Sequence, residues 1–75
     1  MQSKLLILRK ERKITQTELA KLLDISTQSY SRKELGQNEF TADEMFTLAN
    51  YFGLKIEEIF LPRVHQNGVN DGTIN

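Results

Sequence analysis

The chain has 75 residues and no cysteine, and its ten basic side chains balance its ten acidic ones. This length allows a single domain with a small core, and the missing thiols exclude disulfides, thiolate zinc sites and a cysteine nucleophile. No apolar run approaches the roughly 20 residues that cross a bilayer, and residues 1–8 lack the features of a signal peptide. We therefore expect a cytoplasmic protein without a membrane partner.

The charges are divided unequally along the chain. Residues 1–33 carry eight basic and three acidic side chains, a net charge of +5, whereas residues 34–75 carry two basic and seven acidic ones, a net charge of −5. A phosphate backbone responds to the local field and not to the total charge. The division fits a nucleic-acid partner for the first part of the chain, and chance clustering on a solvated surface is the alternative.

The first part of the chain predicts two helices. The first, over residues 2–12, has leucines at helical spacing. Thr15 and Glu18 then have the spacing of a capping box, and the apolar Ile14 before them has the spacing of a hydrophobic staple. A second helix should therefore begin near residue 16.

A third helix should follow after a very short connection. Ser26 is placed to cap it at residue 27, and Gly36 is placed to end it in a left-handed conformation. Ala20, in the preceding helix, is small enough to let the two helices approach closely. Two short helices joined by so tight a turn predict a helix-turn-helix, with its second helix at about residues 27–35.

Two more helices are predicted in the second part of the chain. Thr41 and Glu44 repeat the capping-box spacing, so a helix should begin near residue 42. A short fifth helix over residues 55–60 would complete an all-α, compact five-helix bundle. We expect this domain to cover residues 1–61, and we expect residues 62–75, which are rich in Asn and Gly, to form a disordered C-terminal tail.

The order and spacing of these motifs resemble the helix-turn-helix domain of phage repressors and Cro proteins, the XRE family. The resemblance covers residues 8–60. Its matching residues are Leu8-Arg9, Thr15-Gln16 with Glu18-Leu19-Ala20, Ile25-Ser26, Ser31-Arg32 with Glu34 and Gly36, and Leu48-Ala49 with Phe52-Gly53-Leu54 and Glu58-Ile59-Phe60. It implies a lambda-repressor-like DNA-binding domain that binds a near-palindromic double-stranded operator as a homodimer. The implied function is that of a small transcriptional regulator, expected to be a repressor, of bacterial or phage origin.

Three residues depart from the family pattern. Asp24 stands where a turn glycine is usual, and Asp tolerates the left-handed backbone better than most residues. Tyr30 replaces an aliphatic residue; its ring should fill the core while its hydroxyl reaches a DNA edge or a phosphate. Lys33 stands where a bulky apolar residue is common, which should leave that end of the helix looser or more basic.

DNA binding would divide between two sets of side chains. Base reading is expected from the open face of the third helix, because amide and guanidinium groups match base edges there: Thr27, Gln28, Ser31 and Arg32. The resemblance implies phosphate contacts by Gln16 at the start of the second helix and by Gln37 and Asn38 after the third, and the charge of Lys33 is expected to add to them. The alternatives are plain solvent exposure for Gln28 and Ser31 and an extra capping role for Thr27.

Arg9 and Glu34 match positions that often hold an ion pair in this family. Such a pair would tie the first helix to the end of the recognition helix and orient it without touching bases. Two independent surface charges are the alternative.

Other functions are weighed against these features. The alternative regulator is the antitoxin of a toxin–antitoxin pair, which binds a protein toxin and its own promoter, with the tail or the acidic half contacting the toxin. A helix-turn-helix used only to bind proteins should lack the polar reading face. The sequence has no nucleophile–base constellation, metal cluster or phosphate-binding glycine loop, so we expect no enzyme, no cofactor and no metal ion.

Overall fold

The computed structural model describes residues 1–60, where all the regular structure is helical. The helices of this part are α1 (Ser3–Glu11), α2 (Gln16–Leu23), α3 (Thr27–Leu35), α4 (Ala42–Phe52) and α5 (Ile56–Ile59). The all-α fold with five helices that the sequence predicts is therefore confirmed. The predicted domain end at residue 61 and the predicted tail at residues 62–75 lie outside the described residues.

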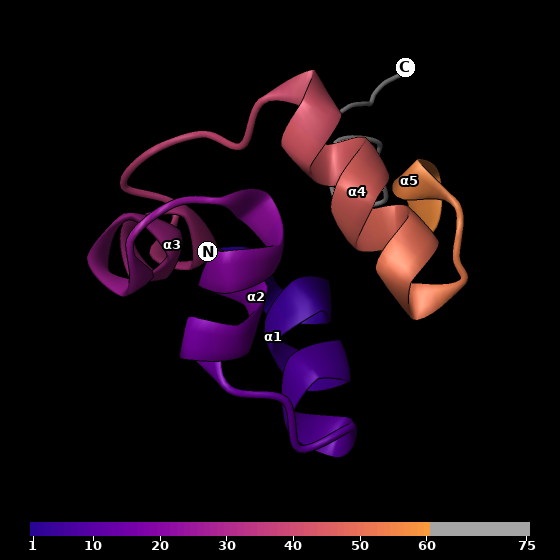
Figure 1. The fold of residues 1–75 in the computed structure, drawn as a ribbon. Coiled ribbons are helices and arrows are strands. Elements are labelled where there is room, and N and C mark those ends of the chain that lie inside the picture. Colours follow the sequence, from indigo (N-terminus) through magenta and orange to yellow (C-terminus); the bar gives the residue numbers. More distant parts are fainter. Residues whose placement is uncertain (61–75) are drawn as a thin grey trace.

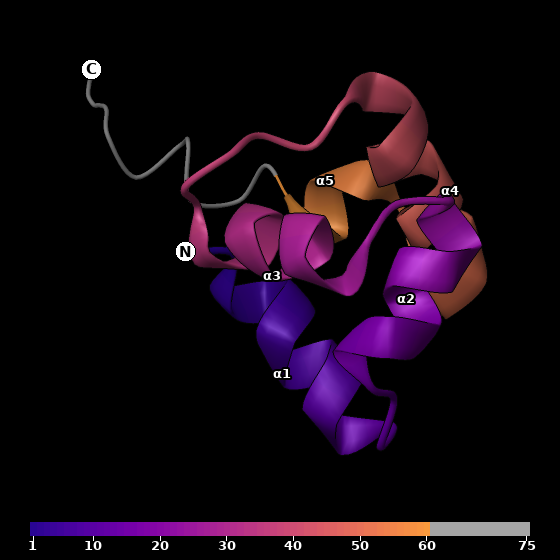
Figure 2. The same ribbon diagram turned by 60° about the vertical axis from the view of Figure 1, so that its left-hand side comes forward.

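The helices are arranged so that α2 packs chiefly against α3, while α4 packs against both α2 and α5. Figure 1 shows α3 on one side of the molecule and the pair α4 and α5 on the other. In Figure 2, turned by 60°, α3 runs across the middle of the view, above α1. The predicted recognition helix α3 thus packs on α1 and α2 with one side, and its other side faces outward.

Side-chain caps set the starts of three helices. The hydroxyl of Thr15 accepts the backbone N–H of Glu18 at 3.1 Å, and the Glu18 carboxylate accepts the Thr15 N–H at 2.8 Å. Thr41 and Glu44 repeat both bonds before α4, at 3.1 and 2.9 Å. Ser26 accepts the backbone N–H three residues later, at 3.0 Å. The predicted starts near residues 16, 27 and 42 are confirmed.

Three helices end at a residue with a left-handed backbone. Asp24 ends α2 with φ 59° and ψ 43°, while Gly36 and Gly53 end α3 and α4 with φ 88° and 71°. A Cβ at Gly36 would also lie 2.8 Å from the backbone nitrogen of Met1, so glycine is required there for two reasons. Asp24 forms the turn as predicted, but it carries steric strain that a glycine would avoid.

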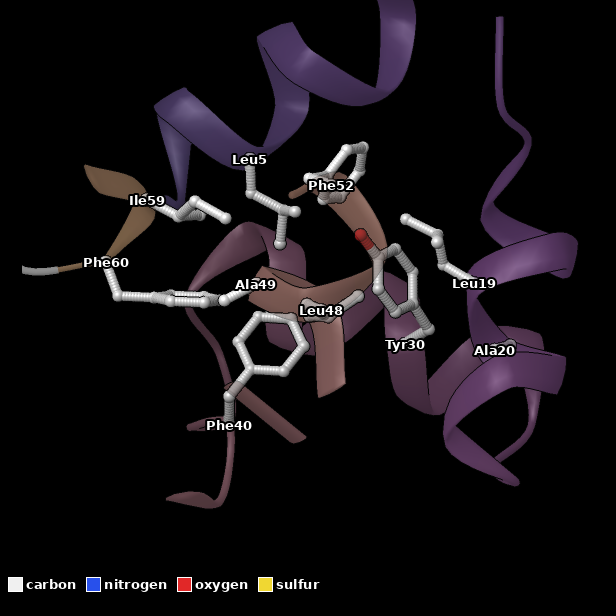
Figure 3. Close-up of a cluster of buried hydrophobic side chains, with 10 residues drawn as sticks. All are labelled: Leu5, Leu19, Ala20, Tyr30, Phe40, Leu48, Ala49, Phe52, Ile59 and Phe60. Atoms are coloured by element: carbon white, nitrogen blue, oxygen red, sulfur yellow. The ribbon is translucent and has the colours of Figure 1, made fainter. Parts of the chain in front are cut away.

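Buried side chains from all five helices and from the α3–α4 loop form one core (Figure 3). Within it the rings of Tyr30, Phe40 and Phe60 meet edge to face, with successive centroids 5.9 and 5.6 Å apart. The Tyr30 ring fills the core as predicted. Burial of a large apolar side chain stabilises a fold by about 1.5–3 kcal/mol. The buried apolar set is Leu5, Leu19, Ala20, Tyr30, Phe40, Leu48, Ala49, Phe52, Ile59 and Phe60.

Candidate nucleic-acid interface

The predicted base-reading residues lie together on the outer side of α3. Thr27, Gln28 and Arg32 are exposed and Ser31 is half-buried, whereas Tyr30, on the opposite side of the helix, is fully buried. Residues three and four apart on a helix share a face, so these hydroxyl, amide and guanidinium groups form one polar surface. We call this surface the reading face of α3.

Leu35 extends the reading face beyond the residues predicted from the sequence. Its side chain is 48% exposed, and it follows Ser31 by four residues and Gln28 by seven, which is helical spacing. An exposed apolar side chain beside polar groups is suited to the methyl group of thymine. The spacing alone could have identified this residue, but leucines at helical spacing usually indicate a core.

The starts of α2 and α3 meet at two threonine hydroxyls. Thr27 donates a hydrogen bond from its hydroxyl to that of Thr17, at 3.3 Å. Ser26, and not Thr27, caps α3 through its side chain. The contact therefore places two helix N-termini, each with the positive end of a helix dipole, close to one another.

A shallow hollow lies beside the start of α2, and we call it the α2 hollow. Lys10 and Lys13 line it ahead of the helix, Gln16 and Thr17 line it from the first turn, and Thr27 lines it from α3. Ammonium groups, hydroxyls and free backbone N–H groups at a helix start give the positive potential that phosphate oxygens require. The structure thus places the predicted phosphate contact Gln16 in a site suited to that role.

Four hydrogen bonds converge on the carboxylate of Glu34, which is only 3% exposed. Arg9 donates from Nε to Oε2 at 2.8 Å and from Nη2 to Oε1 at 3.0 Å. The Tyr30 hydroxyl donates to Oε2 at 2.8 Å, and Gln16 Nε2 donates to Oε1 at 2.9 Å. A carboxylate has about four acceptor positions, so this arrangement fills all of them. We call these four side chains the Glu34 network.

The Glu34 network bears on two expectations from the sequence. Arg9 and Glu34 form the ion pair that the family resemblance implied, so α1 is joined to the last turn of α3. The expectation that the Tyr30 hydroxyl reaches a DNA edge or a phosphate is wrong, because this hydroxyl is buried and donates to Glu34 instead. Burial of the ring requires a partner for its hydroxyl, and Glu34 is that partner.

The network keeps its charges at neutral pH. Burial opposes ionisation of Glu34, but hydrogen bonds from Arg9, Gln16 and Tyr30 outweigh this effect and lower the pKa of Glu34 below its ordinary value of 4.5. The hydrogen bond to Glu34 raises the pKa of Arg9. Burial, together with the hydrogen bond to Glu34, raises the pKa of Tyr30 far above 10.0. The hydroxyl therefore remains a protonated donor.

Lys33, a predicted phosphate contact, is engaged elsewhere. Its Nζ lies 2.6 Å from Oε1 of Glu44, with the two side chains 15% and 13% exposed. Burial opposes ionisation of Glu44, but hydrogen bonds from Lys33 and the Thr41 backbone N–H outweigh it and lower the pKa of Glu44. Lys33 thus fixes the end of α3 to α4 and its own charge is paired, so this end is not looser and Lys33 does not make it more basic, contrary to the expectation. A phosphate contact by Lys33 would require this ion pair to open.

Gln37 and Asn38 lie in the loop that follows α3, and both are exposed. Their backbone N–H groups donate to the carbonyl of Arg32 at 2.9 and 3.3 Å, which holds the loop against the last turn of α3. The nine residues of α3 span about 13 Å and separate this loop from the α2 hollow. The predicted phosphate contacts thus flank the reading face at both ends.

Within residues 1–60, no three His, Cys, Asp or Glu side chains are grouped so as to hold a metal ion. None of the helices in this part of the chain is long and apolar enough to cross a membrane. The site offers hydrogen-bond donors, acceptors and positive charge on an outward helix face, which suits recognition of a grooved, negatively charged surface.

Two short helices at a tight turn, with a polar reading face on the second and a basic hollow at the first, define a DNA-binding helix-turn-helix protein. The helix-turn-helix family pattern matches residues 5–59. An uncharacterized HTH-type transcriptional regulator of Methanocaldococcus jannaschii is 38% identical over 61 residues, covering 81% of this chain and 92% of that protein. The chain belongs to the XRE-type helix-turn-helix family of transcriptional regulators, which is a family without enzymatic activity. The resemblance implied a bacterial or phage origin, whereas this relative is archaeal.

Proposed function

We propose that this protein is a sequence-specific transcriptional repressor whose α3 lies in the major groove of double-stranded DNA. The observation that carries the proposal is the reading face of α3, presented on a helix that the Glu34 network holds from behind. On this face Gln28 is suited to adenine N6 and N7, and Arg32 is suited to guanine O6 and N7. Repression needs only that the bound protein exclude the transcription machinery, so it requires no further surface. The protein would act on DNA in the cytoplasm.

Phosphate contacts on both sides of the groove would set the register of α3. The α2 hollow, with Gln16, Lys10 and Lys13, would bind one strand, and the loop with Gln37 and Asn38 would bind the other. Such contacts release counterions, so the affinity for DNA should fall as the salt concentration rises.

Selection of bound duplexes from a random pool tests this function. The wild-type protein should enrich a near-palindromic motif whose half-sites lie about one helical turn, roughly 34 Å, apart. Arg32→Ala should lose the preference for one base pair in each half-site while it still binds DNA. Lys4→Ala is the matched control, because Lys4 is an exposed cation at the end of α1 opposite Lys10 and should select the wild-type motif. Absence of any enriched motif at low salt would contradict the proposal.

A homodimer is the second part of the proposal, and the α4–α5 region supports it. Phe46 is 60% exposed, the most exposed of the large apolar side chains in residues 1–60. It lines a hollow with Leu54 and Ile56, and Lys55 and Glu57 lie on the same hollow. Within the described residues neither of these two charged side chains takes part in an ion pair. In Figure 1, α4 and α5 lie on the side away from α3, so a subunit bound here leaves the reading face open.

Opposite charges beside one apolar hollow are complementary to the same surface on a second copy. A twofold axis brings Lys55 of one subunit to Glu57 of the partner subunit, and the reverse contact forms by symmetry. The apolar side chains between them would be buried in the contact.

Charge exchange tests this surface without DNA. In sedimentation equilibrium, Lys55→Glu alone and Glu57→Lys alone should each weaken the dimer, because each places like charges opposite one another. An equal mixture of the two variants should form a heterodimer, since both of its contacts are again of opposite sign. Lys4→Glu changes the net charge by the same amount as Lys55→Glu, so it is the control for that variant and should dimerise as the wild type does. Equal association of all variants would exclude this surface.

A further inference from the structure

We propose that Tyr30 is a positioning residue for DNA binding: its buried hydroxyl, acting through Glu34, holds the side-chain amide of Gln16 at the wall of the α2 hollow. This inference rests on the proposed function, because it assigns the α2 hollow to a DNA phosphate. It goes beyond the ion pair that the family resemblance implies, because the hydroxyl of Tyr30 is a departure of this chain from the family pattern.

The two oxygens of the Glu34 carboxylate are shared among three donor side chains. Oε2 accepts from Tyr30 at 2.8 Å and from Arg9 Nε at 2.8 Å, while Oε1 accepts from Arg9 Nη2 at 3.0 Å and from Gln16 at 2.9 Å. The carboxylate is planar, so donors that fix one oxygen also fix the position of the other. Tyr30 therefore acts on the oxygen opposite the one that Gln16 uses.

Glu34 also sets the orientation of the Gln16 side-chain amide. A primary amide presents two N–H donors on its nitrogen and a carbonyl acceptor on its oxygen, and a carboxylate can only accept. Glu34 therefore selects the rotamer in which Nε2, and not the amide oxygen, lies against the network. One N–H of this nitrogen is used by Glu34, and the second remains for a ligand in the hollow that Gln16 lines. If the amide were flipped, its carbonyl oxygen would take the place of Nε2, and this N–H donor would be lost from that position.

A tyrosine is well suited to hold the Glu34 carboxylate in place. Its ring is fully buried and meets the ring of Phe40 edge to face, so the core fixes the place of its hydroxyl (Figure 3). Arg9 is not devoted to Glu34 alone, because its Nη1 also donates a hydrogen bond to the carbonyl of Ile14 at 3.1 Å. An aliphatic residue in place of Tyr30 would fill part of the core but would leave Oε2 with one acceptor position empty. The hydroxyl thus links the packing of the core to the phosphate site.

The test is a double-mutant cycle between Tyr30→Phe and Gln16→Ala in the full chain, with Tyr51→Phe as the control, because Tyr51 is exposed. Affinity is measured by fluorescence anisotropy for the selected operator and for a duplex of unrelated sequence. Tyr30→Phe should weaken binding of both duplexes by a similar factor, roughly tenfold, because a phosphate contact carries no sequence information. In the Gln16→Ala background the same substitution should leave affinity unchanged. Tyr51→Phe should bind as the wild type does.

Two further readouts separate positioning from mere stability. Urea unfolding should show that Tyr30→Phe lowers stability with or without Gln16, whereas its effect on affinity requires Gln16. In 15N spectra without DNA, the side-chain amide protons of Gln16 should shift in Tyr30→Phe and not in Tyr51→Phe. This second readout needs only that the variant folds, and Phe keeps the ring that fills the core.

The outcomes are distinguishable. Additive effects of Tyr30→Phe and Gln16→Ala on affinity, or a Tyr30→Phe variant with lower stability and unchanged affinity, would overturn the positioning role alone. A wild-type protein that binds neither duplex would overturn the proposed function and this role with it. Unchanged Gln16 amide protons in Tyr30→Phe would show that the hydroxyl does not act on Gln16.

Discussion

The ammonium of Lys33 and the carboxylate of Glu44 lie 2.6 Å apart, and this ion pair joins the last turns of α3 to the capping box of α4. The same Oε1 of Glu44 accepts the backbone N–H of Thr41 at 2.9 Å. One carboxylate therefore starts α4 and anchors α3. Because the loop between the two helices is held at both ends, the ion pair fixes how the end of the reading face is presented.

The first prediction concerns Lys33→Met. Loss of a mostly buried, charge-assisted hydrogen bond should lower the free energy of unfolding by about 1.5–3 kcal/mol. The slope of log K against log salt for DNA binding should stay the same, because the ammonium is bound to Glu44 and not to a phosphate. Lys10→Met is the matched control: it should leave unfolding nearly unchanged and reduce that slope by about 0.9. A reduced slope for Lys33→Met would mean that Lys33 leaves Glu44 on DNA.

The second prediction concerns Arg9→Met. Removal of the guanidinium leaves the buried Glu34 carboxylate without its cation, which should lower the free energy of unfolding by about 3–5 kcal/mol. Replacing both partners, Arg9→Met with Glu34→Met, should recover part of that loss, since no unpaired charge remains. Urea titrations of Arg9→Met, of Glu34→Met and of the double variant measure the three losses. Additive losses would show that the two charges do not act as a pair.

The third prediction is a dependence of stability on pH. The folded-state pKa values of Glu34 and Glu44 are lowered from 4.5, so unfolding takes up protons at these carboxylates in mildly acid solution. Their contribution to stability should be fully present above about pH 4.5 and should be lost as the pH falls further, through the lowered values. Thermal unfolding between pH 7 and pH 3 measures this. Glu44→Gln, which does not titrate, should show a shallower decline, and an identical decline would exclude Glu44 as a contributor.

The features of this fold that the sequence predicts are those that depend on residues close together in the chain. Thr15 and Glu18 lie three residues apart, and so do Thr41 and Glu44, so both partners of each capping box can be read directly from the sequence. Pairs such as Lys33 with Glu44 join different helices, and their contact depends on packing that no local pattern encodes. For this reason the ion pair of Arg9 with Glu34, 25 residues apart, came from the family resemblance and not from spacing.

The partner of the Tyr30 hydroxyl could have been predicted from a local rule. Tyr30 and Glu34 are four residues apart in one helix, so they share a face, and a buried tyrosine beside a carboxylate has an obvious partner. The family resemblance implied only Arg9 as a partner of Glu34, and the Tyr30 hydroxyl was expected to contact DNA. A carboxylate has about four acceptor positions, so Glu34 can accept a hydrogen bond from the Tyr30 hydroxyl in addition to those from Arg9.

The last prediction concerns the turn between α2 and α3, where Asp24 has φ 59° and ψ 43°. A non-glycine residue in this conformation is strained by its Cβ, and Asp is less strained than most. Asp24→Gly should therefore raise the free energy of unfolding by about 0.5–1 kcal/mol, the relief of strain exceeding the entropy that glycine loses on folding. Asp24→Ala should lower it, because alanine keeps the Cβ and tolerates the left-handed conformation less well than Asp. Urea unfolding of both variants decides this, and a stabilising Asp24→Ala would show that strain does not govern the turn.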